Sequence, residues 1–361
     1  MNLCPPRFLI PVVISLAAVT IGHAQTTVTT DPVGFVTGTC LAASDTVVSV
    51  PFHQSPAYVG PLSSAPTNSG SNAILSFSAP GWSTNQYQFT HYVRFSSGAK
   101  AGSYYQVIAN DGSTLTIALN GDTVAVSGSG DQIQLIPFWT LDTLFPPATQ
   151  TTIVASAGTT PPLRKTQILF PDLAKDGINL SASAVYFLNG STWTKAVTGF
   201  PTAGTTIIPP DCSFIIRHPA SVATPTAFVP QGTVETGTLV SPLYTLASGF
   251  QDNAIAISRP VPLTLDEAGL ASGFVASNGT APPSRRDQIL VFDNTATGLN
   301  KSASAVYFLS ATVSGTNWVQ ATTGFPIVSG SKILQPGTGI IIRKYQASGG
   351  ATAFWTNSPT Y

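Results

Sequence analysis

Few side chains in this sequence have the types and spacing that catalysis needs. Beyond the first two dozen residues there are three histidines, His53, His91 and His218, and only two glutamates, Glu235 and Glu267. A general base is most often a histidine or a carboxylate beside the reacting group, and glycoside hydrolysis needs two carboxylates flanking the bond. A spatial cluster of His53, His91 and an aspartate would form a hydrolase site, so an extracellular hydrolase stays as one alternative.

The aspartates and cysteines add no recognisable catalytic motif. Asp111, Asp122 and Asp131 stand beside glycine or asparagine in predicted turns, where an Asp side chain hydrogen-bonds the nearby backbone. The sequence has no nucleophile elbow, zinc-protease motif, phosphate loop or dinucleotide fingerprint, and no C-x-x-C pair. These patterns favour a non-catalytic protein and predict neither a cofactor nor a metal ion.

The strongest feature is an internal repeat. PLRKTQILFPDLAKDGINLSASAVYFL (162–188) aligns without a gap with PSRRDQILVFDNTATGLNKSASAVYFL (283–309), and 16 of 27 positions are identical. After a four-residue insertion the match resumes and ends at FIIR (214–217) and IIIR (340–343). Two copies of a unit this long indicate two related domains, because solenoid repeats are shorter and more numerous.

Charged residues recur at matched positions in the two copies. Asp172 and Asp293 follow QIL, and Arg217 and Arg343 end the copies. Since only 8% of the residues are charged, we expect each arginine to form a structural ion pair with the aspartate of its own copy. The alternative is a ligand site that is present twice.

Aromatic residues suggest a second kind of site. Trp193 and Trp318 occupy matched positions, and we expect them in the two cores, because large aromatic side chains dominate core energetics. Trp82, Tyr87 and Trp139 lie outside the repeat. Exposed rings of this kind stack on sugars, so these three are the candidate ligand-binding residues of a polysaccharide-binding module.

Alternating β-branched residues dominate the rest of the chain. Strands are predicted over 104–109, 114–119, 124–126 and 133–137, joined by Asn- and Gly-containing turns. The repeated octapeptide SASAVYFL (181–188 and 302–309) becomes apolar on both faces toward its end, which is typical of a central strand. The sequence predicts an all-β protein with two related antiparallel β-sandwich or β-barrel-like domains, and an inserted β-meander in the first.

The domain boundaries follow from the repeat and from the N-terminal segment. Residues 1–24 have a positive start, a short apolar run and small residues before a cleavage site at Ala24, which indicates a signal peptide. Residues 25–230 form the first domain, with an extra segment over about 53–131, and residues 231–361 form the second. The chain is therefore expected to be secreted, periplasmic or at the cell surface. It has no later apolar run of bilayer length, so no transmembrane segment is predicted after cleavage.

Cys40 and Cys212 remain after cleavage. In an exported protein they could form a disulfide, whose long loop would stabilise the fold by up to about 5 kcal/mol. They could equally be two small buried side chains, and the sequence leaves both interpretations open.

The balance of charge limits the partners. Lys and Arg number 15 and Asp and Glu number 15, so a basic surface for nucleic acid is not expected. Cell-surface polysaccharide and other copies of this chain remain as partners.

Several motifs in order resemble a known group of sequences. DPVGF (31–35), PFWTLDTLFP (137–146), the paired QIL…D…G-x-N-x-S-x-S…YF segments and the IIR ends resemble a family of exported bacterial proteins that occurs as many paralogues and has no assigned function. The resemblance implies export and a two-part β architecture, and it transfers no catalytic residue. We therefore expect an exported structural or surface-associated protein, with polysaccharide binding and hydrolysis as alternatives.

Overall fold

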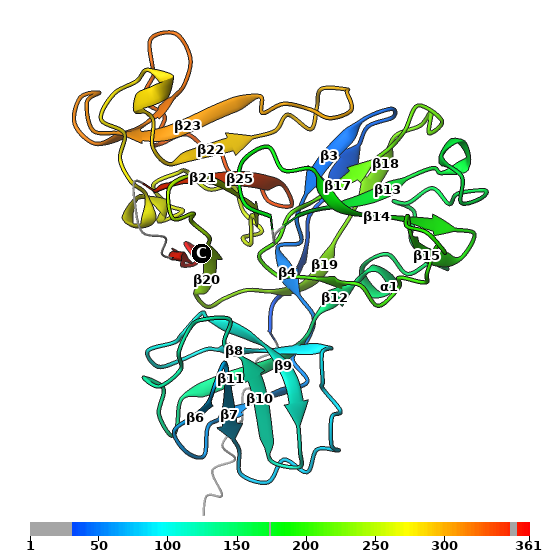
Figure 1. Ribbon diagram of the computed structural model, residues 1–361, viewed down its shortest axis with the longest axis vertical. Helices are drawn as coiled ribbons and strands as arrows, with labels where there is room; N and C mark the ends of the chain where they lie inside the picture. Colours follow the sequence, from blue (N-terminus) through cyan, green and yellow to red (C-terminus); the bar gives the residue numbers. More distant parts are fainter. Residues whose placement is uncertain (1–30, 173–174, 347–351) are drawn as a thin grey trace, which may run out of the picture. The chain divides into compact units, whose positions relative to one another are not determined.

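The computed structural model describes residues 31–172, 175–346 and 352–361. By its contacts the chain divides into Met1–Asp31 and Pro32–Tyr361, and the predicted signal peptide lies outside the described residues. Pro32–Tyr361 is built from antiparallel strands (Figure 1), which confirms the all-β class. The helical elements of the described part are short: α1 (Leu141–Leu144) and the 3₁₀ turns η1 (Pro161–Leu163), η2 (Leu270–Gly273) and η3 (Pro282–Ser284).

Two five-stranded sheets contain the repeated segments. The first has the order β15 (Thr192–Lys195), β14 (Ala182–Asn189), β13 (Gln167–Pro171), β17 (Phe214–Arg217) and β3 (Asp45–Val48). The second has the order β24 (Asn317–Gln320), β23 (Ala305–Ser310), β22 (Gln288–Val291), β25 (Gly339–Gln346) and β21 (Gly249–Ala256). In both sheets the QIL strand lies between the octapeptide strand and the IIR strand (Figure 1).

The octapeptide ends as a central strand in each sheet, as predicted. Tyr186 and Leu188 of β14 pack in one core around Trp193, and Tyr307 and Leu309 of β23 pack in another around Trp318. Each of these strands has a neighbour on both sides. Phe187 and Phe308, which point to the opposite face, are fully buried as well, so the end of each strand needs apolar side chains on both faces.

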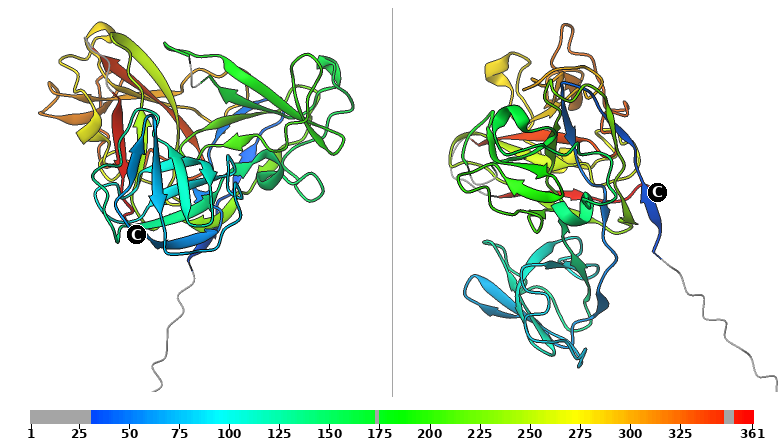
Figure 2. Two further views of the ribbon diagram at one scale, coloured as in Figure 1. Left: turned by 60° about the horizontal axis from the view of Figure 1, so that its bottom comes forward. Right: turned by 90° about the vertical axis from the view of Figure 1, so that its right-hand side faces the viewer.

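The inserted segment forms a seven-stranded sheet with a core of its own. Its order is β5 (Tyr58–Pro61), β11 (Gln132–Pro137), β8 (His91–Phe95), β9 (Tyr104–Asn110), β10 (Thr114–Ala118), β7 (Asn72–Ser76) and β6 (Thr67–Ser69). Figure 2 shows these strands, coloured from blue through cyan to blue-green, from two further sides.

Two details of the predicted meander are wrong. Residues 124–126 form turns and no strand, because Ser127 N–H bonds back to the Val124 carbonyl and Ala125 N–H bonds to the Thr123 hydroxyl. Strand β11 does not continue the meander after β10. It lies instead between β8 and β5 in the sheet and pairs with both of them.

The remaining strands form small antiparallel sheets. They are β1 (Val33–Phe35), β19 (Gln231–Val234) and β4 (Phe52–His53) in one; β12 (Trp139–Thr140) and β16 (Ile207–Ile208); β18 (Thr226–Phe228) and β2 (Gly38–Cys40); and β20 (Leu239–Leu243) and β26 (Ala353–Asn357). Strand β19 begins at the predicted domain boundary and pairs with strands from the start of the chain.

The two cysteines are free thiols rather than a disulfide. Cys40 is fully buried in the first core, whereas Cys212 precedes β17 and forms a β-bridge with Ile255 of the second sheet. The two residues thus belong to different packing environments. Burial raises the pKa of Cys40 to about 11 and also raises the pKa of Cys212, so both thiols stay protonated.

Candidate functional site

Two of the three predicted sugar-binding residues, Trp82 and Tyr87, pack against other rings. Trp82 makes edge-to-face contacts with Tyr58, Phe77 and Tyr87, at centroid distances of 5.2, 5.2 and 5.6 Å. Tyr87 is buried. Trp139 lies outside this cluster: its indole N–H donates to the Phe52 carbonyl and its ring packs on the first core. The structure therefore brings Trp82 and Tyr87 together but not Trp139.

The histidines occupy three separate environments. His53 Nδ1 bonds the Gln54 carbonyl, and His91 Nδ1 bonds the Thr90 hydroxyl. Burial lowers the pKa of His91 to about 4. His218 is fully buried between the hydroxyls of Thr166 and Thr226. Within the described ranges, no group of three His, Cys, Asp or Glu side chains could hold a metal ion, and no helix is long and apolar enough to span a membrane.

Both glutamates are held in ion pairs. Glu235 pairs with Arg94, and the two side chains are almost completely buried. Glu267 pairs with Lys332 on the surface, and the lysine together with the backbone N–H of Thr264 lowers the pKa of Glu267 to about 2. The pKa of Glu267 is thus moved away from the range that a general acid needs.

The repeated arginines form the most distinctive polar arrangement. Arg217 binds Asp45 through two hydrogen bonds of 2.7 Å, from Nε and Nη2, and its Nη2 also donates to Asn300 Oδ1 at 2.6 Å. The backbone N–H of Asn300 donates to Asp45 Oδ2 at 2.7 Å. Asp45 and Arg217 lie in the first sheet and Asn300 follows the QIL strand of the second, so this trio joins the two repeats.

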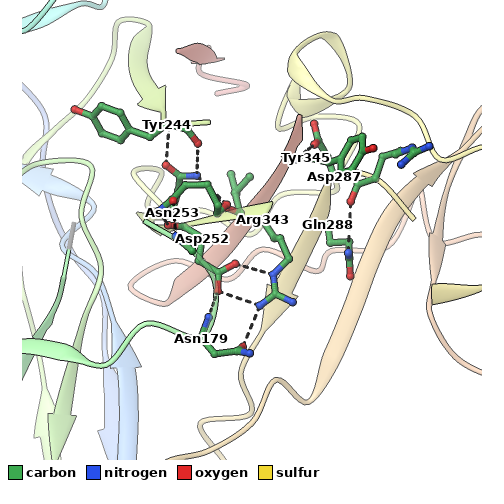
Figure 3. A network of polar contacts seen from close by, with 12 residues as sticks. Asn179, Tyr244, Asp252, Asn253, Asp287, Gln288, Arg343 and Tyr345 are labelled. Atoms are coloured by element: carbon green, nitrogen blue, oxygen red, sulfur yellow. Dashed lines mark hydrogen bonds and ion pairs between the residues drawn. The ribbon is translucent and has the colours of Figure 1, made fainter. Parts of the chain in front are cut away.

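A second trio makes the same contacts in the opposite direction (Figure 3). Arg343 binds both carboxylate oxygens of Asp252, at 2.7 and 3.0 Å, and donates to Asn179 Oδ1 at 3.1 Å. The backbone N–H of Asn179 donates to Asp252 Oδ2 at 2.7 Å. Here the ion pair belongs to the second sheet and the asparagine to the first repeat. We call the two trios the reciprocal clamps.

The loops that carry the asparagines explain why each copy keeps G-x-N. Asn179 and Asn300 have φ angles of 54° and 51°, a left-handed conformation that Asn tolerates better than most residues. The preceding Gly177 and Gly298 accept hydrogen bonds from the backbone N–H groups of Asp252 and Asp45. Each loop therefore binds the edge strand of the other sheet through its backbone as well as its side chain.

The arginines do not pair with the aspartates expected from the sequence, Asp172 and Asp293. Arg217 stands opposite Gln167 at the start of β13, whereas Asp172 comes five residues later, about 17 Å along an extended strand. Asp293 accepts hydrogen bonds from Thr295 in an exposed turn. The carboxylates that meet the arginines come instead from β3 and β21. A weak sequence match, SDTVVSVP (44–51) with QDNAIAISRP (251–260), was the signal that could have found them.

A cleft of ≈ 470 Å³ lies between the repeats, next to the first clamp. Its apolar floor comes from matched positions on both sheets: Val47, Leu169 and Ile215 from the first and Ala254, Leu290 and Ile341 from the second. These side chains point away from the two cores, since their strand neighbours Ile168 and Ile289 are core residues. The rim contains the first residues of both octapeptides, Ser181 and Ala182, and Ser302 and Ala303.

Close backbone approach brings the two sheets together beside this cleft. Ser213 and Gly339 occupy the same position before the IIR strands, and a Cβ atom at Gly339 would lie 2.3 Å from Ser213 Cβ. Glycine is therefore required there on steric grounds. The β-bridges Val48–Thr338 and Cys212–Ile255 lie on either side of this contact and involve matched residues.

A second hollow, the aromatic groove, has a volume of ≈ 530 Å³. Its walls include Tyr244 and Phe354, which are 49% and 45% exposed, together with Asn120 and Asp122 from the inserted segment. The Asp122 carboxylate accepts a hydrogen bond of 2.6 Å from the Tyr105 hydroxyl. This groove offers exposed rings and polar groups on one surface.

Comparisons with known proteins add no relative: no protein-family model, curated protein or solved structure matches this chain. The fold and the site define an all-β protein in which two sheets of the same strand order are joined by reciprocal clamps.

Proposed function

We propose that this chain is an exported, non-catalytic structural protein of the cell surface and belongs to the bacterial family that its motifs resemble. The observation that carries the proposal is that the repeated polar residues bind one another. Arg217 and Arg343 were candidates for a ligand site present twice, but each binds a carboxylate of its own sheet and an asparagine of the other repeat. Residues that hold two sheets together serve architecture, because their donors and acceptors are already paired.

Assembly between copies would use an exposed strand edge. Val33 and Phe35 of β1 are 76% and 68% exposed, and among the described strands β1 pairs only with β19. An open edge with large apolar side chains is a site for pairing with another chain. We therefore place self-assembly at β1.

The test is the cellular location and the oligomeric state of the chain produced with its own N-terminal segment. We expect cleavage near Ala24, protease-sensitive protein on intact cells, and oligomers in sedimentation velocity whose size grows with concentration. Phe35→Lys should shift the distribution to monomer, whereas Val126→Lys, which changes an exposed residue of a turn, should not. A stable monomer found only in the culture medium would exclude this function.

Polysaccharide binding is the second candidate, and the aromatic groove favours it. Sugar rings stack on exposed aromatic faces and bond to nearby polar groups, and Tyr244, Phe354 and Asn120 provide both. The site differs from the one expected at Trp82.

The aromatic groove predicts which substitutions affect sugar binding. Tyr244→Ala and Phe354→Ala should each weaken binding about tenfold or more, as expected for central aromatic residues of a binding site. The measurement is affinity electrophoresis, in which cell-surface polysaccharide of the bacterium that makes the protein is held in the gel and retards the protein. Phe89→Ala is the control, because Phe89 is 52% exposed and does not line the groove. Equal retention of all three variants, or no retention of the unaltered protein, would exclude the groove as a sugar site.

A further inference from the structure

The inter-repeat cleft exposes apolar surface that a purely structural role does not require. Its floor is formed by apolar side chains of both sheets, and Ile215, Ala254 and Ile341 keep part of their surface accessible. A volume of ≈ 470 Å³ falls within the range of small-molecule sites, which is about 300–1,000 Å³. Leaving apolar surface in water is unfavourable by roughly 25 cal/mol per Å², so an apolar ligand would be stabilised here.

The two rims of the cleft differ at one matched position. Leu180 follows Asn179 in the first repeat, and Lys301 follows Asn300 in the second, and both residues line the cleft. The neighbouring rim residues are identical serines and alanines, Ser181 with Ser302 and Ala182 with Ala303. One rim is therefore cationic and the other apolar.

Among the charged groups that line the cleft, the Lys301 ammonium can still bind an anion. Asp45 lines it but is only 2% exposed, and its carboxylate accepts hydrogen bonds from Arg217 and from Asn300 N–H. Arg217 also lines the cleft, so two cations accompany one carboxylate. The Lys301 ammonium donates to the Asp293 carbonyl, which uses one of its three N–H donors. The exposed Asp293 carboxylate accepts hydrogen bonds from Thr295 and interacts with Lys301 through its charge, but it does not line the cleft.

We propose that the cleft binds an amphipathic anion, a single acyl chain with a terminal carboxylate, whose carboxylate meets Lys301 and whose chain lies on the apolar floor toward Leu180. A carboxylate complements the free donors of Lys301 through charge-assisted hydrogen bonds. An unbranched chain fits between two sheet faces that present matched aliphatic side chains. The orientation of the ligand follows from the difference between the two rims, because one has Lys301 where the other has Leu180.

The test is calorimetric titration of the folded chain with decanoate, decanol and acetate. We expect decanoate to bind in the micromolar range with one molecule per chain, decanol about tenfold more weakly, and acetate without detectable heat. Lys301→Leu copies the residue of the first repeat and should remove the preference for decanoate over decanol, a change of about tenfold. Lys195→Leu is the control, because Lys195 in β15 does not line the cleft.

A second variant tests whether the acyl chain of the ligand lies in the cleft. Ala182→Phe adds a ring at an exposed rim position and should weaken both decanoate and decanol by about tenfold without lowering the melting temperature. Equal binding of decanoate and decanol to the unaltered protein would overturn the role of Lys301. Absence of heat from decanoate, or binding that Ala182→Phe leaves unchanged, would overturn the cleft as the site.

Discussion

Lys344→Met is expected to destabilise this protein by about 3–5 kcal/mol, whereas Lys332→Met in the same repeat leaves the urea midpoint nearly unchanged. Lys344 and Asp287 stand opposite one another next to the paired residues Arg343 and Gln288, and their side chains are 3% and 0% exposed. Removing the ammonium leaves a buried carboxylate with the backbone N–H groups of Val275 and Tyr345 as its donors. Such a charge has lost its counterion and cannot regain water.

The two lysines make a matched comparison. Lys332 also pairs with a carboxylate, Glu267, but their side chains are 52% and 37% exposed, so water and salt screen the interaction. The same Lys-to-Met change thus tests burial alone. The measurement is equilibrium unfolding in urea for both variants, and equal midpoints would show that the Asp287–Lys344 pair contributes no more than a surface pair.

The first repeat shows how the buried pair can be replaced. Thr166 and His218 stand at the positions of Asp287 and Lys344, and their side chains hydrogen-bond at 3.0 Å. Burial lowers the pKa of His218, so this pair is neutral. The double variant Asp287→Thr/Lys344→His should therefore recover at least half of the stability that Lys344→Met loses, since replacing both charges removes the unpaired ion.

Local patterns predicted the strands better than the polar contacts. Alternation in SASAVYFL and the Asn- and Gly-containing turns lie within a few residues of the strands they define, so the sequence predicted the octapeptide strands and, in the inserted sheet, β9, β10 and β11. The stretch over 124–126 was too short for its apolar pattern to outweigh turn hydrogen bonds.

The clamps could not be predicted in this way. Arg217 and Asp45 are 172 residues apart, and Arg217 and Asn300 are 83 apart. The repeat alignment identified the arginines and asparagines as a set, but it favoured a carboxylate close in sequence. Strand register decides otherwise, because it places β3 beside β17 and Asp45 directly opposite Arg217. The cleft was missed for the same reason: its floor exists only once two distant sheets face each other.

Breaking both clamps is expected to separate the unfolding of the two repeats. Asp45→Ala and Asp252→Ala each remove a carboxylate that is 2% or 6% exposed and accepts hydrogen bonds from an arginine and from a backbone N–H group. Each single variant should lose about 2–4 kcal/mol. Because the clamps join the same two sheets, the two changes should not be additive, and their coupling should exceed about 0.5 kcal/mol.

Calorimetry distinguishes a clamp from an ordinary ion pair. The unaltered protein and each single variant should show one main transition for the two five-stranded sheets. The double variant should show two, because each sheet retains its own core around Trp193 or Trp318 while the polar contacts of both clamps are lost. Asp293→Ala is the matched control: this aspartate is shared by both copies, but its carboxylate accepts hydrogen bonds from Thr295 of its own turn and belongs to neither clamp, so its loss should leave the transition in place. A double variant that still unfolds in one transition near the original temperature would show that apolar contacts, such as the approach of Gly339 to Ser213, couple the repeats and that the clamps do not.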